Sequence, residues 1–181
     1  SRTLLRFLGA ATPDGARDFV PWLTKGLKRY FLKGRPGSGK STLLGRVAAE
    51  AASRGFDTEI YRCGFDPDSL DMVIVRELGV AIFDSTAPHE YFPERESDEI
   101  IDMYETCIRP GTDEAFAGEI AALSEAYRTE MKEAIGHLAR ARSHFDRIVQ
   151  IYAGAFDYIS ADLLKSDLRQ EWSRHLSLKK A

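Results

Sequence analysis

A short glycine-rich stretch near the start of the chain has the residue types and the spacing that bind phosphate groups. Gly34 to Ser41 reads GRPGSGKS and matches the pattern G-x-x-x-x-G-K-[ST]. Glycines let the backbone wrap closely around a phosphate, and N–H groups at the start of the next helix donate to it. The alternative is a glycine-rich turn before an ordinary helix. An apolar strand before the stretch and an amphipathic helix after it favour a nucleoside triphosphate site.

Each position of this stretch has an expected role at a site for ATP and Mg²⁺. Lys40 is expected to reach the β- and γ-phosphates, Ser41 to coordinate Mg²⁺ through its hydroxyl, and Thr42 to contact the α-phosphate. ATP is expected rather than GTP because the sequence has no NKxD-like guanine motif. The other predicted binding residues are Gly34, Arg35, Pro36, Gly37, Ser38 and Gly39.

A carboxylate at the end of an apolar strand is the expected partner of this loop. The segment VAIFD ends at Asp84, which would lie at the carboxyl edge of the sheet and hold Mg²⁺ through water. The alternative is an Asp that caps the turn after its strand. The next residue is Ser85, where many ATPases of the additional-strand class have a Glu that polarises water, and Asp84 does not start a D-x-x-G motif.

Two polar loops contain the candidates for the remaining chemistry. Asp66, Asp68 and Asp71 lie in CGFDPDSLD, and Asp66 is the first candidate to orient a phosphoryl acceptor because it is nearest the strand end. The same letters are also typical of a turn with local hydrogen bonds. His89, in DSTAPH, is a candidate to sense the γ-phosphate or to orient water, and a structural role is the alternative.

Hydrophobic periodicity predicts an α/β fold of the P-loop NTPase type, with a mostly parallel sheet and covering helices, over residues 1–96. A turn-rich segment is expected at residues 9–15. A short helix is expected within residues 16–27, where Pro21 either lies early in the helix or kinks it. A long helix is expected from Gly39 to Arg54, closed by Gly55. The expected strands are Leu4–Leu8, Arg29–Lys33, Thr58–Arg62, Met72–Val75 and Val80–Phe83, of which Met72–Val75 also fits a short helix.

Residues 97–181 are expected to form a helical segment. One short helix is predicted from Ser97 to about Ile108, and a long helical hairpin follows from Asp113, with its bend near residues 153–160. The expected packing seam of the hairpin is Phe145, Tyr152, Phe156 and Tyr158. Its arginines either form a solvated face or close over the phosphates; they are Arg140, Arg142 and Arg147.

Composition sets limits on the class of protein. The 181 residues have a net charge of −3, so nucleic acid is not an expected partner. They are 44% hydrophobic, which is enough to form a normal hydrophobic core. Two cysteines without metal-like spacing favour a reducing compartment, with Cys63 as a buried thiol. No apolar run approaches the length of a membrane span, so the chain is expected to be cytoplasmic.

Four segments resemble a little-characterised family of bacterial P-loop ATP-binding proteins: FLGAATPDG, KRYFLKGRPGSGKST, CGFDPDSLD and LGVAIFDSTAPHEYFP. Members of that family contain two similar P-loop halves in tandem, each with a helical insertion. The resemblance implies binding of ATP and Mg²⁺ by residues 34–42 and Asp84, but it implies neither a substrate nor a catalytic base. This chain resembles one half, the second, so pairing with another P-loop half or with a second copy is expected.

The function expected from the sequence is slow ATP hydrolysis coupled to a conformational change or to a protein partner bound through the helical hairpin. The absence of a Glu after Asp84 counts against fast hydrolysis. One alternative is a kinase that transfers the γ-phosphoryl group to a small molecule or nucleotide. Another is a nucleotide-dependent binding module with little turnover.

Overall fold

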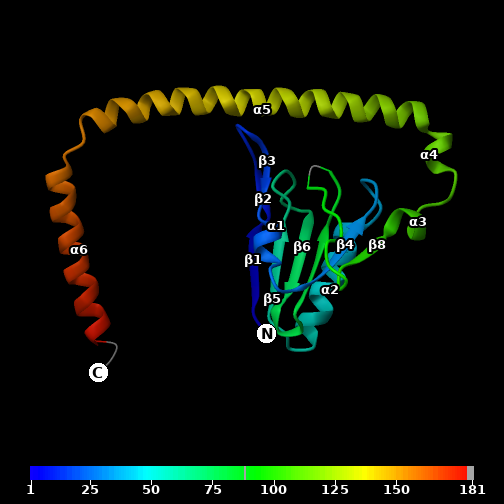
Figure 1. The fold of residues 1–181 in the computed structure, drawn as a ribbon, viewed down its shortest axis with the longest axis horizontal. Coiled ribbons are helices and arrows are strands. Elements are labelled where there is room, and N and C mark those ends of the chain that lie inside the picture. The colour runs from blue at the N-terminus through cyan, green and yellow to red at the C-terminus, as the bar shows by residue number, and fades with distance from the viewer. Residues whose placement is uncertain (88, 179–181) are drawn as a thin grey trace. The chain divides into compact units, whose positions relative to one another are not determined.

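The computed structural model describes residues 1–87 and 89–178, and it has an α/β fold with a six-stranded sheet and a C-terminal helical segment (Figure 1). Contacts divide the chain into two units, Ser1–Ala139 and Arg140–Ala181. The strands of the sheet are β1 (Thr3–Phe7), β4 (Lys28–Lys33), β5 (Thr58–Arg62), β6 (Leu70–Val75), β7 (Val80–Asp84) and β8 (Glu99–Asp102). The helices are α1 (Val20–Leu23), α2 (Lys40–Ser53), α3 (Met103–Cys107), α4 (Thr112–Ala115), α5 (Ala117–Gly154) and α6 (Tyr158–Leu178).

The sheet has the strand order β1-β5-β6-β7-β4-β8, and it is mostly parallel, as predicted. Only β6 runs antiparallel to its neighbours, β5 and β7, while the other pairs are parallel. The carboxyl ends of five strands and the start of β6 therefore meet at one edge. This edge is where ligands bind in open α/β sheets.

The predicted unit of strand, glycine-rich loop and helix is present. β4 is buried at Phe31 and Leu32 and enters the loop, and α2 follows and packs its apolar side on β6. At the end of α2, Gly55 has a φ of 90°, and the N–H groups of Gly55 and Phe56 donate to Ala52 and Ala51. This is the Schellman arrangement, so the helix ends where the glycine predicted it.

The opposite face of the sheet is covered by α1 and by the segment that follows β7. Val20 and Leu23 of α1 pack with Phe31 and Phe83, whose rings meet edge-on at 4.8 Å between centroids. Pro21 lies in the first turn of α1, where its missing N–H costs no helical hydrogen bond. The early position expected for Pro21 is confirmed.

The turn-rich segment expected at residues 9–15 is instead a β-hairpin, formed by β2 (Gly9–Thr12) and β3 (Gly15–Asp18). Backbone approach explains why small residues allow it. A Cβ on Gly64 would lie 2.5 Å from the carbonyl oxygen of Gly9, so the hairpin base rests directly on the chain that leaves β5. The hairpin also takes residues 16–18 from the segment in which a helix was expected.

The single short helix expected from Ser97 to Ile108 is wrong in its first half. Glu99–Asp102 is strand β8, which pairs in parallel with β4, so the sheet continues beyond residue 96. Asp102 then starts α3, because its Oδ1 accepts from the N–H groups of Tyr104 and Glu105. The side chain that caps the helix therefore also marks where the strand must end.

The C-terminal helical segment is present, and α5 and α6 are joined at residues 155–157, within the predicted bend. The predicted packing seam is not formed, because its four aromatic side chains are all exposed. Phe156 and Tyr158 of that set form an edge-on ring pair across the bend. Among the described residues, no helix combines the length and the apolar character needed to cross a bilayer.

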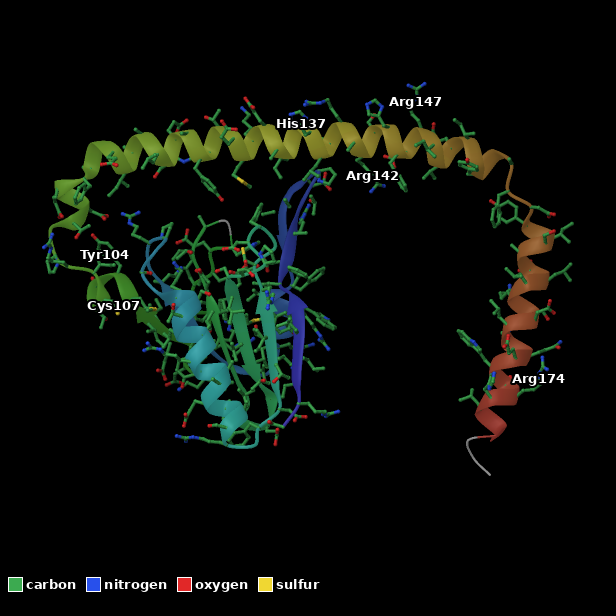
Figure 2. The ribbon with its side chains drawn as sticks, turned by 180° about the vertical axis from the view of Figure 1, so that it is seen from behind. Tyr104, Cys107, His137, Arg142, Arg147 and Arg174 are labelled. Carbon is green, nitrogen blue, oxygen red and sulfur yellow. The ribbon has the colours of Figure 1, made fainter. Side chains whose placement is uncertain are left out.

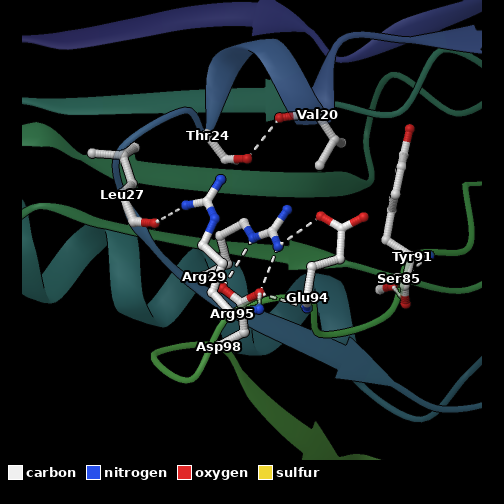
Figure 3. A network of polar contacts seen from close by, with 9 residues as sticks. All are labelled: Val20, Thr24, Leu27, Arg29, Ser85, Tyr91, Glu94, Arg95 and Asp98. Carbon is white, nitrogen blue, oxygen red and sulfur yellow. Dashed lines mark hydrogen bonds and ion pairs between the residues drawn. The ribbon is translucent and has the colours of Figure 1, made fainter.

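A buried ion pair ties the segment after β7 to the central strand β4 (Figure 3). Asp98 accepts from Arg29 through Nε at 3.0 Å and through a terminal nitrogen at 2.5 Å, and also from the backbone N–H groups of Glu94 and Arg95. The Asp98 side chain is fully buried and that of Arg29 is 5% exposed. The Arg29 guanidinium is the main reason that the pKa of Asp98 lies well below its usual range.

We expect Asp98→Asn to lower the free energy of unfolding by about 2–3 kcal/mol, because it leaves a buried guanidinium without its counter-charge. Asp162→Asn, which removes an exposed carboxylate paired with Lys165, is the matched control and should change stability by less than about 0.5 kcal/mol. Urea unfolding measures both.

The pH dependence of this difference is a second readout. The folded pKa of Asp98 is depressed, so its contribution is present above the unfolded pKa of about 4 and is lost as pH falls below it. The gap between wild type and Asp98→Asn should shrink under acid. A gap that is constant down to pH of about 2 would contradict the ion-pair account.

Candidate functional site

The glycine-rich loop has a conformation that requires its glycines. Gly37 and Gly39 have φ angles of 84° and 88°, in the left-handed region that other residues avoid. A Cβ on Gly34 would lie 2.5 Å from the Oγ of Ser38, so a larger residue there would fill the inside of the loop. The three glycines of the pattern therefore shape a concave backbone turn in front of α2.

Lys40 lies inside this turn rather than in solvent. Its Nζ donates to the carbonyl oxygens of Gly34 and Arg35, at 2.9 and 3.1 Å, and lies 3.6 Å from Oδ2 of Asp84. The side chain is 8% exposed. The loop thus holds the ammonium group at the position from which it can exchange carbonyl oxygens for phosphate oxygens.

Further hydrogen-bond donors lie beside the Lys40 ammonium group, and their chemistry shows whether the loop suits a phosphate. The N-terminus of α2 has no side-chain cap, so the first N–H groups of the helix lack an intrahelical acceptor. The Oγ of Ser38 is buried and has no hydrogen-bond partner in the described part of the chain. Backbone N–H groups, a hydroxyl and a buried ammonium form a donor set that matches the oxygens of a phosphate.

The two predicted Mg²⁺ ligands lie beside this donor set. The Oγ of Ser41 accepts from the Leu70 N–H at 2.9 Å, which leaves a second lone pair for a cation. Oδ1 of Asp84 accepts from the N–H and the hydroxyl of Thr86, at 3.0 and 2.6 Å, while Oδ2 faces Lys40. Asp84 therefore caps its own turn with Oδ1, as the alternative interpretation expected, and keeps Oδ2 toward the loop, while its role as a Mg²⁺ ligand stays a prediction.

Ser85 has a structural role that explains why it follows Asp84. Its side chain is completely buried, and its Oγ donates to the carbonyl of Tyr91 and accepts from the Tyr91 N–H. Lys33 adds to this connection, since its Nζ donates to the carbonyls of Ser85 and Tyr91. These contacts fix the loop after β7 against the end of β4, with His89 between the fixed points.

His89 is held by a carboxylate from the β2–β3 hairpin. Its Nδ1 lies 2.6 Å from Oδ2 of Asp18, whose Oδ1 accepts from the Tyr91 hydroxyl at 2.7 Å and from the Val20 N–H at 3.0 Å. Burial alone would raise the pKa of Asp18, but these hydrogen bonds outweigh it and lower the pKa. Because Asp18 favours the ionised form, it orients Nδ1–H of the imidazole toward itself, and Nε2 is then the nitrogen that can accept a proton.

The pKa of His89 is raised by several negative charges around the imidazole. The hydrogen bond to Asp18 is the largest cause that raises the pKa of His89, burial opposes it, and the negative charges of Asp71 and Asp84 add to the rise. In the same way, the charges of His89 and Lys40 act on Asp71. These interactions connect His89 electrostatically with the carboxylates at the strand ends.

Of the three Asp candidates in the segment CGFDPDSLD, the structure brings Asp71 to this edge, as the second residue of β6. The pairing of β5 with β6 shifts between Tyr61 and Arg62, and this irregularity leaves Asp71 without a register partner on β5. Its side chain is buried, which is the largest cause that raises its pKa, and the negative charge of Asp84 adds to the rise. Among the carboxyl groups of the segment CGFDPDSLD, that of Asp71 therefore lies among the site residues.

Asp66 and Asp68 lie elsewhere. Both are exposed, Oδ1 of Asp66 accepts from the Asp68 N–H at 3.0 Å, and Asp68 lies 3.8 Å from Arg62. This is the turn geometry that was the alternative for Asp66. Cys63 is half-buried, and burial raises the pKa of its thiol, which disfavours the reactive thiolate.

The arginines considered for a lid lie on α5 in the C-terminal unit (Figure 2). Arg140, Arg142 and Arg147 are exposed, and Nε of Arg142 donates to Asp146 one turn further along the helix, at 2.7 Å. Within that unit they have the character of a solvated helix face.

A cavity of about 510 Å³ opens over the glycine-rich loop. Its walls include Gly34, Arg35 and Pro36 of the loop, together with Asp102 and Tyr104 from the β8 side. The Arg35 guanidinium lies 5.7 Å from the centre of the Tyr104 ring. This volume is in the range of small-ligand sites, and the cavity shares Gly34 and Arg35 with the surroundings of the Lys40 ammonium group.

No cluster of three or more His, Cys, Asp or Glu side chains that would hold a metal occurs among residues 1–87 and 89–178. A cation at Ser41 and Asp84 would therefore need the oxygens of a bound phosphate as additional ligands. Comparison of the chain with protein-family models, with curated proteins and with solved structures finds no match.

Sequence reasoning missed Asp18 and placed Asp66 ahead of Asp71. Asp18 lies 71 residues from His89, so no local spacing joins them. Asp71 is turned inward by an irregularity of strand pairing, which the letters of the loop do not encode. For Asp18, the only signal in the sequence was a carboxylate two residues before the apolar start of a helix at Val20.

We expect Asp18→Asn to lower the pKa of His89, because the substitution removes the hydrogen-bonded negative charge that raises it. The imidazole Cε1–H signals of the four histidines, followed by NMR across pH 5 to about 9, measure this. The titrations of the other three should stay unchanged and serve as internal controls. An unchanged His89 titration would contradict the pairing.

Proposed function

We propose that the chain binds ATP with Mg²⁺ and hydrolyses it slowly. The observation that carries the proposal is the uncapped start of α2, with Lys40 buried in the loop in front of it and the Oγ of Ser38 left without a partner. Backbone N–H groups at a helix start, a buried hydroxyl and an ammonium group together form a donor set that suits an anion. The resemblance of residues 34–42 and Asp84 to the P-loop family supports the same ligand.

The surroundings of the γ-phosphate position favour slow hydrolysis. Ser41 and Asp84 are the proposed Mg²⁺ ligands, and Lys40 would neutralise the β- and γ-phosphates. Ser85 is occupied in holding the loop after β7, so no carboxylate directly follows Asp84 to polarise water. His89 and Asp71 are the groups that remain to orient an attacking oxygen.

A coupled partner is part of the proposal. α5 and α6 expose apolar side chains beyond residue 140, and exposed apolar surface of this kind favours interaction with another protein or another copy. The members with the largest exposure are Ile151, Tyr152, Tyr158 and Ile159. The surface supports the proposal that nucleotide state is passed to a partner of the helical segment.

A kinase is the second candidate function, and a specific observation favours it. The carboxylate–imidazole pair of Asp18 and His89 is the arrangement of an oriented general base, which suits the removal of a proton from a hydroxyl acceptor. In addition, β7 lies directly next to β4, whereas additional-strand ATPases have a strand between these positions.

We expect Lys40→Met to weaken the binding of ATP with Mg²⁺ by at least about a hundredfold, since it removes a buried charge from the phosphate site at similar side-chain volume. Lys25→Met, at an exposed lysine outside the site, is the matched control and should bind as wild type does. Isothermal titration calorimetry measures both. Equal affinity of the two variants would refute the site.

We expect Asp84→Asn to reduce the dependence of ATP affinity on Mg²⁺ and to lower phosphate release by about a hundredfold or more. Release of labelled phosphate from γ-labelled ATP, with a Mg²⁺ titration, measures both effects. Asp14→Asn, at the tip of the hairpin, is the control. A variant with unchanged Mg²⁺ dependence would show that Asp84 only caps its turn.

A further inference from the structure

A second cavity lies beside the first. Its volume is about 440 Å³. Ala16 of β3, Phe65 after β5 and Ala87 after β7 form one side of it, and α5 forms the other. Ala87 and Tyr127 belong to the walls of both cavities, so the two cavities adjoin.

The α5 side of this cavity is built from one helix face. Tyr127, Met131 and Ile135 recur every four residues, so their side chains lie above one another along the helix. With Phe65 they give the cavity an apolar and aromatic lining. A flat apolar ring is the chemical group that this lining fits best.

Two cations border the apolar lining. Arg128 and Lys132 each follow a lining residue of α5 by one position, and both belong to the walls of the cavity. Arg128 also donates to Glu125 at 2.7 Å. An occupant that carries an anionic group in addition to its ring would therefore be favoured over a neutral one.

The pair of Asp18 and His89 lies next to this cavity because near neighbours of both residues in the chain line it. Ala16 and Asp18 are two residues apart on β3, so their side chains share one face of the strand. Ala87 and His89 are close together along the chain, two residues apart in the loop after β7. The hydrogen bond between Asp18 and His89 therefore joins the two segments that line the cavity opposite α5.

We infer that this cavity binds a phosphoryl acceptor, a hydroxyl compound with a flat apolar ring and an anionic group, and that His89 takes the proton of its hydroxyl. The inference rests on the ATP-binding function proposed above. The strand order supports this placement of the acceptor relative to ATP. The glycine-rich loop follows β4, Asp84 ends the neighbouring β7, and Phe65 follows the more distant β5.

The transfer step balances with the groups present. The acceptor oxygen forms a bond to the γ-phosphorus, and the bond from that phosphorus to the β–γ bridging oxygen breaks, so ADP leaves with the electron pair. The hydroxyl proton passes to Nε2 of His89, and Asp18 stabilises the resulting imidazolium. Lys40, Asp71, Asp84 and the hydroxyl of Tyr91 are the other titratable groups that face this pair.

Three methionines provide separate reporters for the test. Met103 packs against Gly34 and Gly39 and reports nucleotide binding, Met131 lines the second cavity, and Met72 is fully buried and reports the fold. The probe is 4-(hydroxymethyl)benzoate, with benzyl alcohol as its uncharged counterpart. Both are titrated to about 10 mM, which fills most of a millimolar site, against methyl-labelled protein with Mg²⁺ and ADP.

The expected result is a saturable shift of the Met131 signal by the benzoate, a weaker effect of benzyl alcohol, and no shift of Met72. Phe65→Ala should raise the dissociation constant of the probe about tenfold, and Phe145→Ala, at an exposed ring of the C-terminal unit, should leave it unchanged. A Met131 signal that does not move, or that moves equally in Phe65→Ala, would overturn the inference. A Met103 signal that ADP does not move would instead overturn the proposed nucleotide site.

Transfer is tested with γ-labelled ATP and the same probe. Label is expected in an acid-resistant phosphate ester of the benzoate, and His89→Gln should lower the rate of its formation about a hundredfold while the Met131 shift persists. Probe bound at Met131 with all label in free phosphate would overturn the acceptor role of the cavity. Equal transfer by His89→Gln would overturn the role of His89 as the base.

Discussion

The carboxylate of Asp18 is the interaction on which the arrangement of the candidate site depends. It is nearly buried, and it accepts from three donors in two segments: the N–H of Val20, which starts α1, and the side chains of His89 and Tyr91 after β7. A buried charge is stable only while its donors stay in place, so the positions of these segments are linked. The hairpin, the helix and the loop are held over the sheet edge as one group.

The direction of the strands determines what this group faces. Five strands end at that edge and β6 begins there, so the edge collects the glycine-rich loop, Asp84 and the first residues of β6. The reversal of β6 matters because it brings Asp71 next to Asp84, and the repulsion between the two carboxylates is part of the reason that the pKa of Asp71 is raised. A cation or a proton between them would relieve that repulsion.

The sequence predicted the features that local patterns encode. Apolar and β-branched runs identified five strands, and the glycine pattern located both the loop and the end of α2. It failed where long-range contacts decide the structure. The hairpin of β2 and β3 lacks alternating apolar residues and forms because Gly9 and Gly64 let two backbones meet, while β8 is a strand because the edge of β4 is available to pair with it. Asp66 was ranked above Asp71 by distance along the chain, and an irregularity in strand pairing reversed that order.

The residue after Asp84 connects the fold to the proposed chemistry. A Glu at that position would point its charge at the attacking oxygen, but it could not make the two hydrogen bonds by which Ser85 holds Tyr91. Those bonds fix the loop that presents His89 to Asp18. Under the proposed function, the chain therefore has Ser85 instead of a carboxylate next to the metal, and it has an oriented imidazole, that of His89, in the loop that follows. An oriented imidazole suits the removal of a proton from a hydroxyl compound, and the second cavity, which adjoins the one over the loop, offers space for such a compound under the inference drawn above.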